Sequence, residues 1–313
     1  MPNNQTIQNF NQRDLHPSFF SNDAFIDQSF YKFPRLGIYD SATLFDFNRA
    51  AALPTVPFVA KGGAVPLSET EVNLTQLSFA RIAATPKIDV WDQSSSRGVD
   101  QLAQQIDAVK RTIQRQISFN IIQGVAPAFT GLETLAFQTS IVNALTGALT
   151  LQDIYRAKNF MCGTGGPYRF GGPGILSCSM MMNEKTQREL FGLLDQASLK
   201  VDWVMDEDVG AKVAEVFGMR IYVNNSIKTN QGAGTDRTSI YFLSFDSPSA
   251  VKLLYSKDEQ HDCDIDGIHS YLLPVKEATN ELYAYVGGFY TLLVPETQGA
   301  VRLFNIKPTF FAQ

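Results

Sequence analysis

The longest regular pattern in the chain is a narrow apolar stripe between residues 99 and 123. Its members recur at spacings of three and four, which is the period of one face of an α-helix. They are Val99, Leu102, Ile106, Val109, Ile113, Ile117 and Ile121. The stripe predicts a helix over 99–123, about 37 Å long, with one face on a sheet or a neighbouring subunit and a polar back. Gly124 follows where a left-handed residue commonly ends a helix.

Residues 1–50 follow neither the helical nor the strand period, yet they are rich in phenylalanine. The rings are Phe19, Phe20, Phe25, Phe30, Phe33, Phe45 and Phe47. An arm with so many rings and no core of its own must bury them on its own body or on another subunit.

The stretch from Leu53 predicts an extended, turning segment, because prolines and the Gly62-Gly63 pair interrupt it. After it Val72 and Leu74 alternate, and Leu77 and Phe79 resume the alternation one residue out of step. That slip predicts a strand with a bulge.

The second half of the chain mixes helices with strands, so the predicted class is α+β. We predict helices after caps at Thr150 and Asn183, and a further helix over 206–217 that ends at Gly218 and runs into a strand. A strand is expected over 175–180, and from residue 238 onward most segments are predicted to be strands. The Gly287-Gly288 pair inside the longest of these strands would allow a bend or a bulge.

Composition narrows the class of protein. Hydrophobic residues make up 44 % of the 313 positions, as in a globular protein, and no run of eighteen apolar residues or signal peptide is visible. The formal charge of −5 without a Lys/Arg-rich run argues against a protein built to grip nucleic acid. Cys162, Cys178 and Cys263 form no CxxC pair and indicate reduced thiols.

The densest polar constellation is "HDCDIDGIH", from His261 to His269. Asp262, Asp264 and Asp266 match the first half of a calcium loop, but Leu273 stands where the closing Glu should be. A polar loop between strands also explains this segment. We therefore predict no metal site, and we keep these three aspartates as weak candidates for one.

No other motif predicts catalysis or a cofactor. The glycine-rich loop over 163–174 lacks the Lys and Ser/Thr of a phosphate-binding loop. Asp89, Asp92 and Asp100 fit helix capping better than acid–base work. The chain is predicted not to be an enzyme.

The order of these parts resembles the major capsid proteins of tailed bacteriophages, whose fold is typified by phage Hong Kong 97. The helix ending in "IIQG" looks like the spine helix of that family. Other similar pieces are "FVAKGGAVPLSETEVNLTQLSFARIAATPKIDVWDQ", "LLDQA", "VAEVFGMRIYVNNSI" and "LLVPETQGAVRLFNI". The resemblance implies an N-terminal arm over 1–50, an extended β-hairpin loop over 51–85, a peripheral domain over 86–145 and 279–313 with a spine helix over 99–123, and an axial domain over 146–278.

The resemblance also implies a function. The chain would self-assemble as hexamers and pentamers into an icosahedral head shell around double-stranded DNA, built in the host cytoplasm and placed in the virion. A portal would be a partner, and so would a separate scaffolding protein, because only about 50 residues precede the loop. Residues expected at assembly contacts are Phe19, Phe20, Lys61, Gly62, Gly63 and Arg81. A Lys–Asn crosslink through Lys61, as in the type member, is not expected.

Two alternatives stay open. The first is an encapsulin-like nanocompartment shell, which would enclose a cargo enzyme in place of DNA. The second is a soluble enzyme or metal-binding protein centred on His261–His269.

Overall fold

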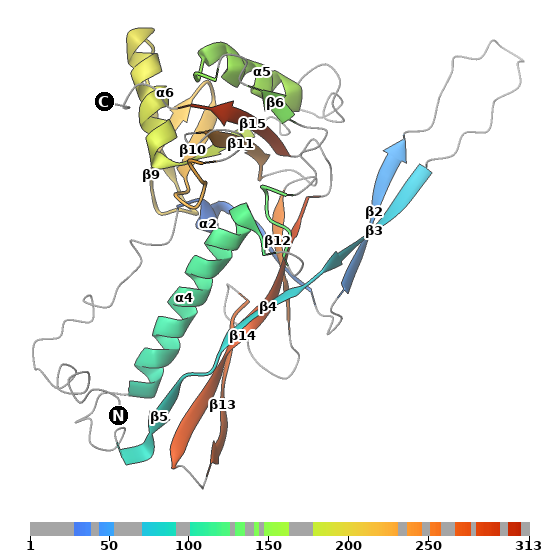
Figure 1. The fold of residues 1–313 in the computed structure, drawn as a ribbon, viewed down its shortest axis with the longest axis vertical. Coiled ribbons are helices and arrows are strands. Elements are labelled where there is room, and N and C mark those ends of the chain that lie inside the picture. The colour runs from blue at the N-terminus through green and yellow to red at the C-terminus, as the bar shows by residue number, and fades with distance from the viewer. Residues whose placement is uncertain are drawn as a thin grey trace, which may run out of the picture.

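Three sheets and four helices form the described part of the chain in this computed structural model. The structure describes residues 28–38, 44–52, 71–91, 101–125, 129–134, 141–143, 147–162, 178–230, 237–245, 251–257, 267–276, 280–294 and 300–307. The chain is α+β, as predicted, and two sheet-based bodies lie end to end along its long axis (Figure 1).

The first body is a seven-stranded sheet covered by two helices. In spatial order its strands are β6 (Ile141–Asn143), β15 (Ala300–Ile306), β11 (Thr238–Ser244), β7 (Cys178–Met182), β10 (Met219–Val223), β9 (Ala211–Val216) and β8 (Asp202–Asp206). Helices α5 (Leu151–Cys162) and α6 (Glu184–Gln196) pack on this body. Both predicted caps are confirmed: Thr150 Oγ1 accepts from the Asp153 amide at 3.1 Å, and Asn183 Oδ1 accepts from the Thr186 amide at 2.7 Å.

The second body is a six-stranded sheet that carries the long helix. Its strands are β1 (Arg35–Ile38), β12 (Lys252–Ser256), β14 (Glu281–Leu293), β13 (His269–Lys276), β4 (Ala80–Ala84) and β5 (Lys87–Asp89). The predicted long helix is confirmed as α4 (Gln101–Gln123), and it contacts β14, β4 and β5. Ile113, Ile117 and Ile121 are buried in the core, and Gly124 has a φ of +71° at the helix end.

The third sheet is a two-stranded hairpin of β2 (Leu44–Ala52) and β3 (Glu71–Ser78). Chain 71–84 passes from this hairpin into the six-stranded sheet, because β3 pairs with β2 and β4 pairs with β14. The predicted bulge at 74–79 is therefore wrong. The slip in alternation instead coincides with Phe79, the residue between the two sheets. The one register shift in the β2–β3 ladder lies on β2, between Ala50 and Ala52.

One further prediction is wrong in the second half. Residues 211–216 form strand β9 instead of a helix, because Phe217 and Gly218 both take positive φ, +54° and +71°, and turn the chain back into β10. At the Gly287-Gly288 pair the ladder with β4 keeps its register, so no bulge forms against that strand, and the ladder with β13 ends at Gly287. A Cβ on Gly287 would lie 2.5 Å from Ala83 Cβ, so this glycine allows a close approach of strands.

Candidate assembly surfaces

The β2–β3 hairpin stands apart from both bodies. Its backbone register runs from Leu44 opposite Ser78 to Ala52 opposite Glu71, and neither strand pairs with a third strand among the described residues. Figure 1 shows the two strands leaving the six-stranded body at an angle. A two-stranded ribbon alone is at best marginally stable in water. The hairpin therefore needs a surface to lie on.

A short N-terminal segment joins the two bodies. Helix α2 (Gln28–Lys32) contacts β10 of the seven-stranded sheet, and β1, which follows it, pairs in parallel with β12 of the six-stranded sheet. Phe30 and Phe33 are 1 % and 2 % exposed, and the Phe33 ring meets Phe245 edge-on at 5.1 Å. These two rings bury on the chain's own body, which is one of the two outcomes predicted for the arm.

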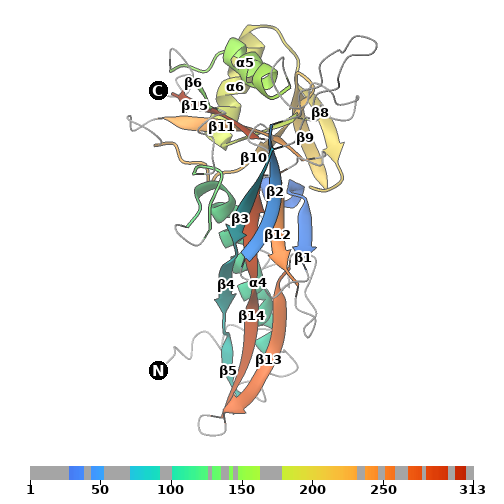
Figure 2. The ribbon, with the colours of Figure 1, turned by 90° about the vertical axis from the view of Figure 1, so that its right-hand side faces the viewer.

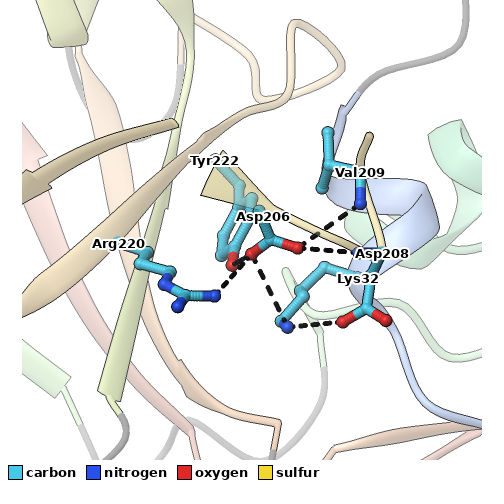
Figure 3. Close-up of polar contacts among 6 residues, drawn as sticks. All are labelled: Lys32, Asp206, Asp208, Val209, Arg220 and Tyr222. Atoms are coloured by element: carbon cyan, nitrogen blue, oxygen red, sulfur yellow. Dashed lines mark hydrogen bonds and ion pairs between the residues drawn. The ribbon is translucent and has the colours of Figure 1, made fainter. Parts of the chain in front are cut away.

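The same segment also contacts the buried carboxylate of Asp206 through Lys32 (Figure 3). Asp206 Oδ2 accepts a 2.5 Å hydrogen bond from the Tyr222 hydroxyl and a 2.9 Å bond from Arg220. Lys32 Nζ lies 3.6 Å from that oxygen and 2.6 Å from Asp208 Oδ2. Asp206 is fully buried, so its charge is balanced by groups from α2 and β10.

The electrostatics of this cluster keep Asp206 ionised. Burial by itself would raise the pKa of Asp206, but the hydrogen bond from Tyr222, the charge of Lys32 and the hydrogen bond from Arg220 outweigh it, and the pKa lies below its usual value. Burial, together with the hydrogen bond to Asp206, raises the pKa of Tyr222 well above its usual value. The cluster is thus an ion-paired structural clamp, and nothing in its geometry resembles a poised acid or base.

Arg81 lies on a partly exposed aromatic face of the six-stranded sheet. Its guanidinium is 5.2 Å from the ring centroid of Tyr285 and 5.9 Å from that of Phe289, and its Nε donates to the Tyr285 hydroxyl at 3.3 Å. Tyr271 stacks on Tyr285 with centroids 4.9 Å apart. Alternation along β14 puts this face opposite the buried Val286, which packs toward α4.

A second exposed apolar group lies at one edge of the seven-stranded sheet. Trp203 and Met205 are 59 % and 55 % exposed and lie two residues apart on β8, hence on one face of that strand. Leu199, in the connection before β8, is also exposed. We call these three residues the edge patch.

The other residues singled out in the sequence divide into two groups. Phe19, Phe20, Lys61, Gly62, Gly63, Asp262, Asp264 and Asp266 lie outside the described residues, as do Asp92, Asp100 and the loop over 163–174. Among those described, Asp89 accepts from the Trp91 amide at 2.8 Å, as a capping residue does, and the buried His269 ring lies 3.1 Å from the Ser256 carbonyl.

Within the described ranges no three His, Cys, Asp or Glu side chains are grouped as metal ligands. None of the helices in that part of the chain is both long and apolar enough to cross a membrane.

The Asp206 cluster and the edge patch were missed by sequence reasoning. Lys32 and Asp208 are 176 positions apart, so no local spacing reports their pairing. The edge patch leaves no clear signal either, because "DWVMD" places three consecutive apolar residues between two aspartates and shows no strand alternation.

Comparisons with known proteins place the fold. No family model and no curated protein matches the chain. Among solved structures it is similar to the SrpI encapsulin of Synechococcus elongatus PCC 7942, with a TM-score of 0.67, 13 % identity and coverage of 96 % of this chain and 92 % of that one. The capsid of a native GTA particle matches with a TM-score of 0.58 and 13 % identity, over 94 % of this chain and 92 % of that one. A structure from Microbacterium phage Oxtober96 matches with a TM-score of 0.58 and 16 % identity, over 88 % of this chain and 89 % of that one.

At such low identity these likenesses establish the fold, and they confirm the resemblance to the Hong Kong 97-like capsid fold.

Proposed function

We propose that this chain, which has the Hong Kong 97-like capsid fold, is a subunit that assembles with copies of itself into a closed shell. The projecting β2–β3 hairpin is the observation that carries the proposal. It pairs with no third strand among the described residues, and a second copy of the chain supplies the surface that a two-stranded ribbon needs. Contacts of this head-to-tail kind close into rings when the rotation between copies allows it.

In finer detail, we propose hexamers and pentamers that form an icosahedral phage head around double-stranded DNA. The head would be built in the host cytoplasm with a scaffolding protein and a portal. The sequence resemblance and the likeness to the GTA capsid support this reading. Arg81, on the aromatic face of β4 and β14, is proposed as one assembly contact, and the role is structural, without catalysis.

An encapsulin-like compartment is the second candidate, and one observation favours it. The SrpI encapsulin matches with a TM-score of 0.67, against 0.58 for the native GTA capsid, and over a similar share of both chains. The contents of purified shells distinguish the two candidates. Nuclease-protected DNA inside them supports a phage head, and a protein cargo supports a compartment.

Truncation of the hairpin tests the shared proposal. Phe45 and Leu77 face each other in register, so an Asn-Gly turn can replace residues 46–76 and close a shortened hairpin. The full chain is expected to form rings or shells by sedimentation and negative-stain imaging. The truncated chain should unfold at the same temperature as the full subunit and stay small. Shells of normal size from the truncated chain would contradict this role for the hairpin.

A further inference from the structure

The edge patch continues the apolar face of the seven-stranded sheet beyond its covering helix. The ring of Trp203 meets that of Phe191 on α6, with centroids 6.3 Å apart and planes at 68°. Trp203 also pairs across the strands with Ala214, which is buried against α6. Despite these contacts, Trp203 and Met205 are each more than half exposed. Apolar side chains gathered in this way mark contact surfaces.

The patch lies on the last strand of its sheet. Among the described residues β8 pairs with β9 alone, so the outer side of Asp202–Asp206 carries backbone groups without a partner strand. Natural proteins cover or protect such edges, because an open edge invites pairing with another chain. Both the side chains and the backbone of β8 therefore present an uncovered surface.

This edge is acidic. Five carboxylates and two lysines lie between residues 199 and 216. Asp206 is neutralised internally by Lys32 and Arg220, whereas Asp202 and Glu207 are exposed beside the patch.

The other side of the same sheet, next to its second edge strand β6, is basic. Residues 237–245 and 300–307, which contain β11 and β15, hold three cations and no carboxylate. Arg237 donates to the Asn305 carbonyl at 3.1 Å, and Arg302 donates to Ser239 Oγ at 3.0 Å. Lys307 is exposed just after β15. Figure 2 shows β6 and β15 on one side of this body and β8 and β9 on the other. We call Arg237, Arg302 and Lys307, which lie on or beside the two strands next to β6, the basic edge.

We infer that adjacent copies of this chain dock head to tail through these two edges, with the edge patch and acidic β8–β9 hairpin of one copy against the basic edge of the next. The inference rests on the proposed function and names the surface through which its subunits meet. Opposite charge selects this arrangement over a symmetric pairing of two β8 edges, which would bring carboxylates against carboxylates. The exposed side chains of the edge patch supply the apolar contact.

Charge reversal on each edge tests the inference. The variants are Asp202→Lys/Glu207→Lys on the acidic edge, Lys307→Glu on the basic edge, and all three changes together. Trp203→Ser probes the apolar contact, and Asp107→Lys, on the exposed side of α4, is the control for a charge reversal away from both edges. Thermal unfolding of each unassembled variant checks that it folds.

Each edge variant and Trp203→Ser should raise the concentration needed for half-assembly about tenfold, whereas Asp107→Lys leaves it unchanged. The triple variant should recover most of the loss, because its two edges are again opposite in charge. Edge variants that assemble like the unaltered chain, or a triple variant no better than the acidic-edge variant, overturn the inference while the shell function stands. An unaltered chain that stays a monomer even with a crowding agent overturns the shell function and this inference together.

Discussion

Lys32 Nζ lies 3.6 Å from the buried carboxylate of Asp206, and this pair ties the N-terminal segment to the edge of the seven-stranded sheet. The lysine belongs to α2, whose next residues enter the six-stranded sheet as β1. One short segment thus holds both bodies, through Phe30 and Phe33 in the core and through Lys32 at the charge cluster. A buried ion pair of this kind is weak evidence of net stability, but the loss of one partner leaves a buried charge uncompensated.

Asp206→Asn is therefore expected to destabilise the unassembled subunit by about 3 kcal/mol. The amide keeps the shape of the side chain but removes the charge that balances Lys32 and Arg220. Urea unfolding at neutral pH measures the change. Asp208→Asn is the matched control, because Asp208 is 60 % exposed and its pairing with Lys32 is worth about 1 kcal/mol or less. Equal effects of the two substitutions would rule out the clamp.

The stability contributed by Asp206 should also depend on pH. The folded-state pKa lies below the unfolded value of about 3.9, so the unfolded chain binds more protons as the pH falls through this window. The contribution is therefore complete above about pH 5 and is lost as the pH falls below about 4. The difference in unfolding free energy between the unaltered chain and Asp206→Asn should be constant near neutrality and shrink in acid. A difference that holds at pH 3 would assign the stabilisation to another group.

Two glycines with the same backbone φ should differ in how much an alanine substitution destabilises the subunit. Gly124 and Gly218 both have a φ of +71°, but a Cβ on Gly124 would lie 2.6 Å from the Gly131 amide nitrogen, whereas one on Gly218 meets nothing within 4 Å. Gly218→Ala should cost about 1 kcal/mol from the left-handed backbone alone. Gly124→Ala should cost about 1–3 kcal/mol more, because backbone must move. Urea unfolding of the pair gives the difference directly, and equal costs would refute the close packing at the end of α4.

Elements with local signals could be predicted from the sequence. The stripe of α4 and the caps at Thr150 and Asn183 depend on residues within a few positions of one another, and each is found where expected. Strands are likewise found over most of the chain after residue 238, where short runs rich in aromatic and β-branched residues predicted them. Local spacing was sufficient in these places because a single face of each element, or a single turn, decides its structure.

The misassigned strand β9 shows where this reasoning ends. Val213 packs into the core shared with α4, and its neighbour Ala214 packs into the core under α6. Both faces of the strand are covered, so alternation disappears and the segment has the composition of a helix. The turn at Phe217 and Gly218 then resembled a helix end. Gly210 and Gly218 bracket only seven residues, a length typical of a strand, and that spacing was the available signal.

The packing of α4 on β14 gives the last prediction. Ile117 is fully buried on the face that contacts the sheet, and Thr112 is exposed one turn earlier, where its hydroxyl donates to the Ala108 carbonyl of the same helix. Ile117→Ala should destabilise the subunit by about 2–5 kcal/mol, since it removes buried methyl groups and leaves a cavity. Thr112→Ala should change stability by less than about 0.5 kcal/mol. Thermal and urea unfolding of both variants measure this contrast. A small effect of Ile117→Ala would mean that the apolar stripe of α4 is held by contacts between subunits instead of by its own sheet.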